Sequence, residues 1–344
     1  MIASRSIPLK TLLKWSGFHI VWLLAGAGAF ALLYKLEYIQ FSLPWLPLSV
    51  IGTAVAFYVG FKNNSAYDRM WEARKIWGAI VNSSRAWGMY VDGFLTDEFA
   101  DGAVSEAEIR SWKQTLIYRH IAWLYALRGQ LLQPQPWEQI GTGGMMGFAA
   151  RMFSRGFGVG LVADETTRDE LKHYLPADEY GRLVSAQNTA TQIINEQSRA
   201  LTIAKRKGLI DDFRHMELEK TLYHFFEHQG KCERIKKFPL PRQYASISRI
   251  FVGIFIFLLP FSMIPELMKL GDWGFWLSIP VSALIGWVYV VMEIVGDWSE
   301  NPFQGLANDI PMLGLCRTIE IDLLEMLGET DLPSPIPIKK NVLM

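Results

Sequence analysis

The sequence lacks charged side chains over four long stretches, and this absence is its most informative feature. No Asp, Glu, Lys or Arg occurs in the segments 15–34, 39–61, 250–265 and 273–292. A hydrocarbon core ~30 Å thick needs about 20 apolar residues as a helix, and three of the four segments have that length. The shorter third segment can begin near Tyr244 if Arg249 extends its guanidinium to the headgroups. A wholly water-soluble protein is therefore excluded.

The sequence also contains few cysteines and has no net charge. The two cysteines, Cys232 and Cys316, are too few for a disulfide framework, so we expect free thiols. The 34 basic residues balance the 34 acidic residues, so no nucleic-acid partner or acidic substrate is indicated. The first apolar segment is too long for the core of a cleavable signal peptide.

Basic residues cluster on one side of the apolar segments. Those expected on that side are Arg5, Lys10, Lys14, Lys62, Arg69, Arg74, Lys75, Lys231, Arg234, Lys236, Lys237, Arg242 and Arg249. The short turns on the other side contain only Lys35 and Lys269. By the positive-inside rule, both termini are cytoplasmic, and we expect a bacterial inner-membrane protein.

The chain is predicted to be an all-α integral membrane protein with four spans and a large cytoplasmic helical bundle. The predicted parts are a first transmembrane hairpin at 1–61 (spans 15–34 and 39–61), a cytoplasmic helical domain at 62–243, a second transmembrane hairpin at 244–298 and a cytoplasmic C-terminal segment at 299–344. Apolar residues at helical spacing predict helices over 64–88, 111–127, 189–207 and 211–228. Prolines and glycines over 133–147 predict a loop, and the proline-containing tail 333–344 is expected to be extended, either wrapped around a neighbouring subunit or disordered.

The second span has one small and partly polar face. Ser49, Thr53 and Phe57 recur at every fourth position and therefore stack on one side of a helix. No charge follows until Lys62, after which the helix can continue through Asn64. Such a face suits a helix that lines an aqueous pathway. Small residues equally allow helices to pack closely in lipid, and the pattern alone leaves both interpretations open.

Several short motifs, in order along the chain, resemble the bacterial branch of the bestrophin family. They are FYVGFKNN at 57–64, YDRMWEAR at 67–74, GKCERI at 230–235, PLP at 239–241, NPF at 301–303, NDIP at 308–311 and CRTIE at 316–320. The resemblance covers nearly the whole chain, including the four-span layout. It implies a homopentameric ion channel with subunits around a central pore, surrounded by membrane lipids and conducting small monovalent ions.

The resemblance also implies where the pore narrows. Matching the FYV motif places the neck at Ser49, Thr53 and Phe57, and counting back from the GKCERI motif places a cytoplasmic restriction at Met216. Family necks usually carry three large apolar residues, whereas this chain keeps only Phe57, so one dominant constriction is expected there. A shift by one residue would present Val50 and Ala54 instead.

Asn64 and Asp68 are expected in the inner vestibule, below the neck. Asp68 and Glu72 there favour cations, or else form ordinary pairs with Arg69 or Arg74 on the helix surface. Anions remain possible permeant ions. Eukaryotic relatives bind calcium through an acidic run after the NPF motif, but here Leu306 and Ala307 offer no side-chain oxygen. We therefore expect no calcium site, metal or cofactor.

Two alternatives to a channel deserve comparison. His224, Glu227 and His228 form an H-x-x-E-H pattern, as in inverted zinc proteases, with His215 or Glu219 as a possible third ligand. Five-residue patterns arise easily by chance, and we expect no enzyme. The other alternative is a membrane scaffold that does not conduct.

Overall fold

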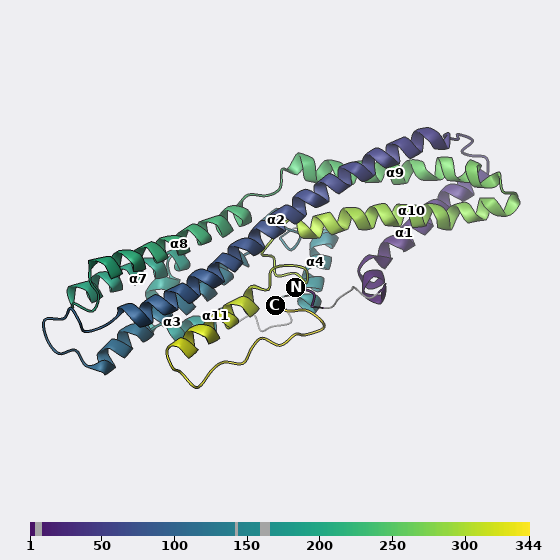
Figure 1. Ribbon diagram of the computed structural model, residues 1–344. Helices are drawn as coiled ribbons and strands as arrows, with labels where there is room; N and C mark the ends of the chain where they lie inside the picture. The colour runs from purple at the N-terminus through teal and green to yellow at the C-terminus, as the bar shows by residue number, and fades with distance from the viewer. Residues whose placement is uncertain (4–8, 142–143, 159–165) are drawn as a thin grey trace. The chain divides into compact units, whose positions relative to one another are not determined.

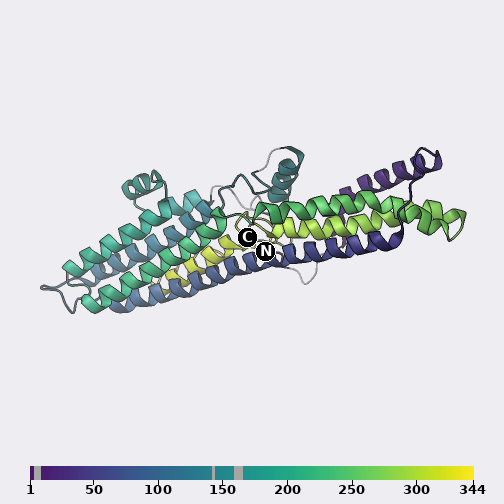
Figure 2. The same cartoon turned by 90° about the horizontal axis from the view of Figure 1, so that it is seen from above.

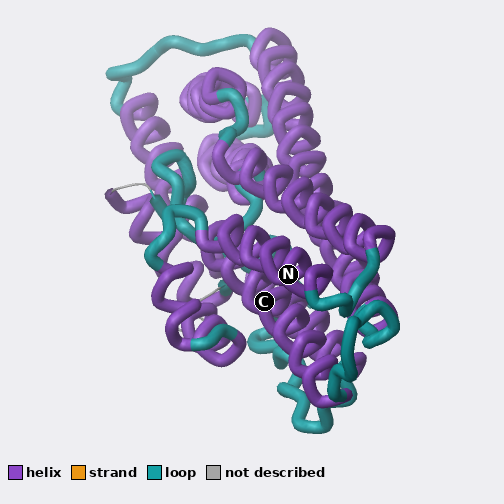
Figure 3. The backbone as a smooth tube through the Cα atoms, turned by 90° about the vertical axis from the view of Figure 1, so that its left-hand side faces the viewer, coloured by secondary structure: helices purple, strands orange, loops and turns teal. Residues whose placement is uncertain are grey.

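The computed structural model describes residues 1–3, 9–141, 144–158 and 166–344. The helices are α1 (Leu9–Lys35), α2 (Trp45–Phe94), α3 (Glu106–Leu131), α4 (Gly144–Phe157), α5 (Thr166–Tyr174), α6 (Ala177–Val184), α7 (Thr189–Arg206), α8 (Asp212–Lys237), α9 (Arg242–Met268), α10 (Asp272–Ser299) and α11 (Met312–Met326) (Figure 1). The described residues form no strand beyond two isolated bridges, and Figure 3 shows only helix and loop there. The predicted all-α fold is confirmed.

The chain divides into two compact units. The helical unit consists of Met1–Ala3, Met70–Phe238 and Pro302–Met344, and the spanning unit consists of Ser4–Arg69 and Pro239–Asn301. Within the described residues, four helices are long and apolar enough to cross a membrane, namely α1 from Trp15, α2, α9 and α10. The four predicted spans are thus each found in a helix of suitable length and composition.

The spanning unit is organised around α10. This helix packs against both α9 and α1, and Figures 1 and 2 show α9 and α10 side by side. α2 joins them at Gly52, where an added Cβ would lie 2.7 Å from the Phe255 ring. The Tyr289 hydroxyl donates to the Gly52 carbonyl at 3.0 Å. A glycine at this position therefore brings the backbone of α2 into contact with its neighbours, as small residues do in membranes.

The second spanning helix begins later than predicted. Residues 39–44 are not helical, and α2 starts at Trp45 rather than at residue 39. Pro44 disfavours helical geometry at Leu43, whose N–H instead donates to the Phe261 carbonyl at 3.1 Å. From Trp45 the helix runs without interruption for 50 residues, so the expected continuation beyond the span through Asn64 is confirmed.

The helical unit has an aromatic core between α2, α3 and α8. His120 stacks on Trp123 with ring centroids 5.2 Å apart, and the Phe225 ring lies 4.4 Å from it. The His120 Nε2 atom lies 2.9 Å from the hydroxyl of Ser84. Burial lowers the pKa of His120 to about 3, so the ring is neutral and serves as a packed polar group.

A second polar cluster ties α11 to this core. The buried Glu320 carboxylate accepts hydrogen bonds from the hydroxyls of Tyr125 and Tyr174, each at 2.5 Å. Arg317, one turn earlier, lies 3.3 Å from the same carboxylate. Burial raises the pKa of Glu320, while the two hydroxyls and the guanidinium oppose that shift. The sequence analysis did not predict α11, because charged residues interrupt the apolar pattern of this segment.

The C-terminal tail folds back on its own chain. The Leu343 N–H donates to the Met1 carbonyl at 2.8 Å, and the Gly314 N–H donates to the Met344 carbonyl at 2.5 Å. Val342 and Met344 are buried, and the two termini lie close together in Figure 1. The tail is extended as predicted, and its end is bonded to the N-terminus and to α11 of its own chain.

The predicted helices of the insert are confirmed, with differences at their ends. The stretches predicted at 64–88, 111–127, 189–207 and 211–228 fall in α2, α3, α7 and α8. The loop predicted over 133–147 is wrong from Gly144, where α4 begins, and residues 142–143 lie outside the described residues. The boundaries of the two units fall after Arg69, Phe238 and Asn301. The first of these lies beyond residue 61 because Lys62 and Asn63 pack against α10.

The two cysteines are free and buried. Burial raises the pKa of the Cys316 thiol to about 12 and that of Cys232 further. We predict that iodoacetamide at mildly alkaline pH labels neither cysteine in the folded protein and both after denaturation, as measured by mass spectrometry. An added reporter, Ser185→Cys on the exposed surface, should react in the folded state. Rapid labelling of Cys232 or Cys316 without denaturant would contradict the buried core.

Candidate functional site: the exposed face of α2 and its buried charge cluster

One face of α2 in the spanning unit is exposed from end to end. We call it the α2 stripe, and it consists of Leu46, Val50, Thr53, Phe57, Phe61, Asn64 and Asp68. These positions are three or four residues apart, which places them on one side of a helix. Phe57 is 65% exposed and Phe61 is 61% exposed. Buried residues such as Val55, Val59 and Lys62 occupy the opposite side.

Two of the three predicted neck residues lie on this stripe. Thr53 and Phe57 are exposed, whereas Ser49 is partly buried at its edge and Val50 is 63% exposed beside it. The Ser49 hydroxyl donates to the Leu46 carbonyl at 2.7 Å, and the Thr53 hydroxyl donates to the Ser49 carbonyl at 2.9 Å. Both hydroxyl protons are thus used within the helix. The upper part of the stripe is therefore less polar than the serine and threonine side chains suggest.

The two predicted vestibule residues continue the stripe. Asn64 and Asp68 are both exposed, two and three turns beyond Phe57. Asp68 forms no salt bridge with a described residue, so the expected pairing with Arg69 or Arg74 is not seen. Glu72 does form an ion pair, but its partner is Arg234 of α8, with a contact of 2.6 Å. Of these two carboxylates, only Asp68 lies on the α2 stripe without an ion pair to a described residue.

Met216, the predicted cytoplasmic restriction, is placed on α8 of the helical unit. Its side chain is 69% exposed, and that of the nearby Phe213 is 83% exposed. Met216 is therefore not part of the packed core of this chain. Phe213, Met216 and Tyr223 all lie on the exposed side of α8, which forms a second mainly apolar exposed face.

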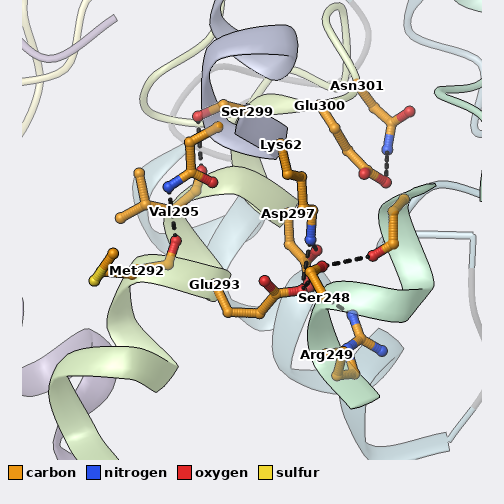
Figure 4. Close-up of polar contacts among 12 residues, drawn as sticks. Lys62, Ser248, Arg249, Met292, Glu293, Val295, Asp297, Ser299, Glu300 and Asn301 are labelled. Carbon is orange, nitrogen blue, oxygen red and sulfur yellow. Dashed lines mark hydrogen bonds and ion pairs between the residues drawn. The ribbon is translucent and has the colours of Figure 1, made fainter. Parts of the chain in front are cut away.

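A cluster of buried charges stands behind the α2 stripe at the end of the spans (Figure 4). We call Lys62, Ser248, Arg249, Glu293 and Asp297 the Lys62 cluster. The fully buried Lys62 ammonium lies 2.6 Å from Glu293 Oε1 and 2.5 Å from Asp297 Oδ1. Ser248 donates to Glu293 at 2.8 Å, and Arg249 bonds the other Asp297 oxygen at 2.5 Å. The cluster therefore joins α2 to both α9 and α10.

The acidic residues after the last span pair with basic residues. Glu293 and Asp297 pair with Lys62, and Glu300 lies 3.3 Å from Arg242. The sequence did not show that Lys62 is the central partner. The sequence signal for this pairing is a lysine one residue beyond an apolar span, together with two carboxylates one helical turn apart at the end of another span.

The backbone next to the Lys62 cluster is close-packed. Asn63 donates from its amide nitrogen to the Met292 carbonyl at 3.0 Å. A Cβ added to Gly296 would lie 2.1 Å from Asn63 Oδ1, so only glycine fits at that position without moving α2 away from α10. These contacts fix the rotation of α2 about its axis, and with it the direction that the α2 stripe faces.

The H-x-x-E-H residues do not form a zinc site. His228 is buried, and its Nε2 lies 3.2 Å from the Ser83 hydroxyl. His224 is exposed and lies 3.5 Å from Glu227. Within the residues that the structure describes, no group of three or more His, Cys, Asp or Glu side chains is arranged to hold a metal ion. The geometry gives the metalloprotease hypothesis no support.

The loop after the NPF motif uses its carboxylate internally. Asp309 is buried and accepts hydrogen bonds from the N–H groups of Phe303, Gly305 and Ile310, at 3.0, 2.9 and 2.7 Å. Burial raises the pKa of Asp309, and these three bonds oppose the shift. Leu306 is buried beside it. The loop is thus closed by its own backbone, and Asp309 is engaged where a calcium ligand would have to be open.

Comparison with known proteins gives consistent matches along the chain. The family model described as "Bacterial/Fungal Bestrophin protein" matches residues 16–325. The "Voltage-dependent anion channel-forming protein YneE" of Escherichia coli (strain K12) is 27% identical over 306 residues, which cover 86% of this chain and 84% of that protein. The "Voltage-dependent anion channel-forming protein mll4386" of Mesorhizobium japonicum is 28% identical over 294 residues, covering 86% and 78%.

The fold has also been seen before. A bacterial bestrophin homolog from Klebsiella pneumoniae aligns with a TM-score of 0.72 at 21% identity, covering 91% of this chain and 98% of that chain. At this identity the likeness shows the shared fold. Four apolar spanning helices together with a helical unit define an α-helical integral membrane protein. The chain belongs to the bacterial and fungal bestrophin family, as its motifs indicated.

The Lys62 cluster leads to a stability prediction. Lys62→Met removes the cation and leaves two carboxylates close together, which costs about 3–5 kcal/mol when a buried pair loses one partner. We expect a clear fall in the temperature at which detergent-solubilised protein loses its monodisperse peak in size-exclusion chromatography. Lys75→Met, at an exposed position of the same helix, is the matched control.

A combined variant tests whether the effect is electrostatic. Adding Glu293→Gln and Asp297→Asn to Lys62→Met removes the unpaired charges and should recover part of the lost stability. If Lys62→Met were as stable as Lys75→Met, the cluster would have no structural importance.

Proposed function

We propose that this chain forms a homopentameric ion channel in which five copies of the α2 stripe surround a central axis. The observation that carries the proposal is that one exposed face of α2 continues from the span into a polar stretch. Within the span this face presents Phe57 and Phe61, and on the same side of the same helix it continues into the exposed Asn64 and Asp68. A helix that lines a pore presents such a face to water and ions, both within the membrane and below it.

The relatives support this class of activity. Proteins about as long as this chain and 27–28% identical to it are named as voltage-dependent anion channel-forming proteins. The concentration of basic residues on one side of the spans supports an orientation in which the termini and the helical unit lie on the cytoplasmic side of a bacterial inner membrane. A membrane scaffold that does not conduct is the alternative, and persistent silence in bilayer recordings would favour it.

The constriction in this proposal is formed by two successive aromatic rings. Phe57 and Phe61 are one helical turn apart, and both are more than half exposed on the α2 stripe. Aromatic rings give a hydrated ion no hydrogen bonds, so a narrow ring of them gates by dewetting. The sequence predicted Phe57 alone, and Phe61 continues the same spacing of four. Because the hydroxyls of Ser49 and Thr53 bond to their own helix, they wet the outer neck only weakly.

Replacing the first of the two aromatic rings tests the pore assignment. Phe57→Ala should raise the current through protein reconstituted in planar bilayers severalfold, because it widens and wets the constriction. Phe257→Ala is a suitable control, since Phe257 of α9 is also 67% exposed but lies outside the α2 stripe. Equal currents for the wild type and Phe57→Ala would count against this neck. A purified particle with the mass of a monomer would exclude the pentamer.

Selectivity depends on the charge below the neck. Five Asp68 carboxylates around an axis would attract cations, whereas the names of the relatives point to anions. We propose that Asp68 biases the inner vestibule toward monovalent cations. In an asymmetric salt gradient, Asp68→Asn should move the reversal potential toward the anion equilibrium potential. Glu72→Gln is the control, because Glu72 is already paired with Arg234. An unchanged reversal potential for Asp68→Asn would remove Asp68 from the selectivity mechanism.

A further inference from the structure

The spanning unit contains a groove that the channel proposal does not use. It has a volume of about 440 Å³ and lies over α10, between α1 and α9. Its lining includes Gly26 and Phe30 from α1, Gly253, Phe257 and Pro260 from α9, and Ser282 from α10. Volumes of this size are typical of ligand sites. Because the lining is almost entirely apolar, the groove suits a hydrocarbon.

The groove exists because small residues face each other across it. α1 and α9 each pack on α10 but make few contacts with one another. A Cβ built on Gly26 of α1 or on Gly253 of α9 would meet no atom within 4 Å. Space is therefore left between the two helices at a depth where the solvent is lipid rather than water.

The floor of the groove carries a polar group without a partner. Ser282 is 5% exposed, and its hydroxyl makes no hydrogen bond within the described part of the chain. Serine in a spanning helix ordinarily bonds to the preceding turn of its own backbone. A buried hydroxyl left unpaired is unfavourable. The surface of α10 that forms the floor of the groove is therefore not packed like a protein core.

The side of α9 that lines the groove also carries a basic residue, Arg249. Arg249, Gly253, Phe257 and Pro260 are spaced by four, four and three residues, so they lie along one side of α9. At a rise of 1.5 Å per residue, Arg249 and Pro260 are about 16 Å apart along the helix axis. That is about half of a hydrocarbon core ~30 Å thick, which is the depth of one leaflet.

Arg249 has binding capacity that its ion pair does not exhaust. Its side chain is 56% exposed, and one terminal nitrogen bonds to Asp297. A guanidinium has five N–H donors in a planar fork that matches the oxygens of a phosphate. A cation at the membrane interface, in line with an apolar groove one leaflet deep, has the two elements that recognise a phospholipid.

We propose that this groove is a phospholipid site, in which one acyl chain lies between α1 and α9 and the lipid phosphate is bound by Arg249. The lipid comes from the leaflet at the Arg249 end of the spans. It fills the space between α1 and α9 and so supports the packing of α1 onto the rest of the unit. This proposal depends on membrane insertion and is independent of ion conduction.

Photo-crosslinking in a defined bilayer tests the site. The wild-type protein is reconstituted in vesicles of phosphatidylethanolamine and phosphatidylglycerol, with a small fraction of phosphatidylglycerol carrying a diazirine in its acyl chain. After irradiation, mass spectrometry should find adducts concentrated on the peptides containing Gly26 and Gly253. Adducts spread evenly over exposed residues elsewhere, such as Phe18 and Leu284, would show only surrounding lipid and overturn the proposal. An absence of adducts on both peptides would show that lipid does not enter the groove, and would also overturn the proposal.

Matched variants separate the two parts of the site. Gly26→Leu with Gly253→Leu fills the groove and should reduce the groove adducts severalfold. Gly28→Leu is the control, because Gly28 also has open space around its Cβ but does not line the groove. Arg249→Gln should lower the number of phospholipids that stay bound in native mass spectrometry, whereas Lys35→Gln, at the other end of α1, should not. Unchanged adducts in the filled groove, or unchanged retention in Arg249→Gln, would contradict the assignment.

Discussion

The charged ammonium of a lysine at the end of a membrane-spanning helix must be either hydrated or paired with carboxylates. This constraint determines how the helices of the spanning unit pack. Lys62 is fully buried and follows directly after the apolar part of α2. A buried ammonium is stable only when paired, because its loss of hydration is large. Glu293 and Asp297 supply the pairing, one helical turn apart on α10. Three helices are thereby joined at one point.

Fixing one face of α2 decides what the other face can do. With Lys62, Val59 and Val55 turned toward the protein, the α2 stripe is turned outward along its whole length. Two phenylalanine side chains are then presented one turn apart, with Asp68 farther along the same side. The proposed pore and the proposed lipid site are consequences of the same packing, because Arg249 belongs to the Lys62 cluster and also stands at the end of the groove.

Much of this architecture can be predicted from the sequence, because a membrane restricts the composition and length of the segments that cross it. Spans must be apolar and about 20 residues long, so their absence of charge locates them. The spacing of four that joined Thr53 to Phe57 also located a real exposed face. Ser49 was less well placed than Val50, because a repeat of four drifts around a helix with 3.6 residues per turn. Phe61 continues the same series, but the three-residue neck pattern of the family ends at Phe57.

The sequence by itself determined the class of fold, the four spans and the family. Those features depend on composition and local spacing, which are properties of the chain alone. Only the tertiary structure decided that Lys62 meets Glu293, that Glu72 meets Arg234, and that His228 faces Ser83 instead of a metal. Only it revealed the groove between α1 and α9. Each of these joins residues far apart in the chain, and such contacts depend on how whole helices pack against one another.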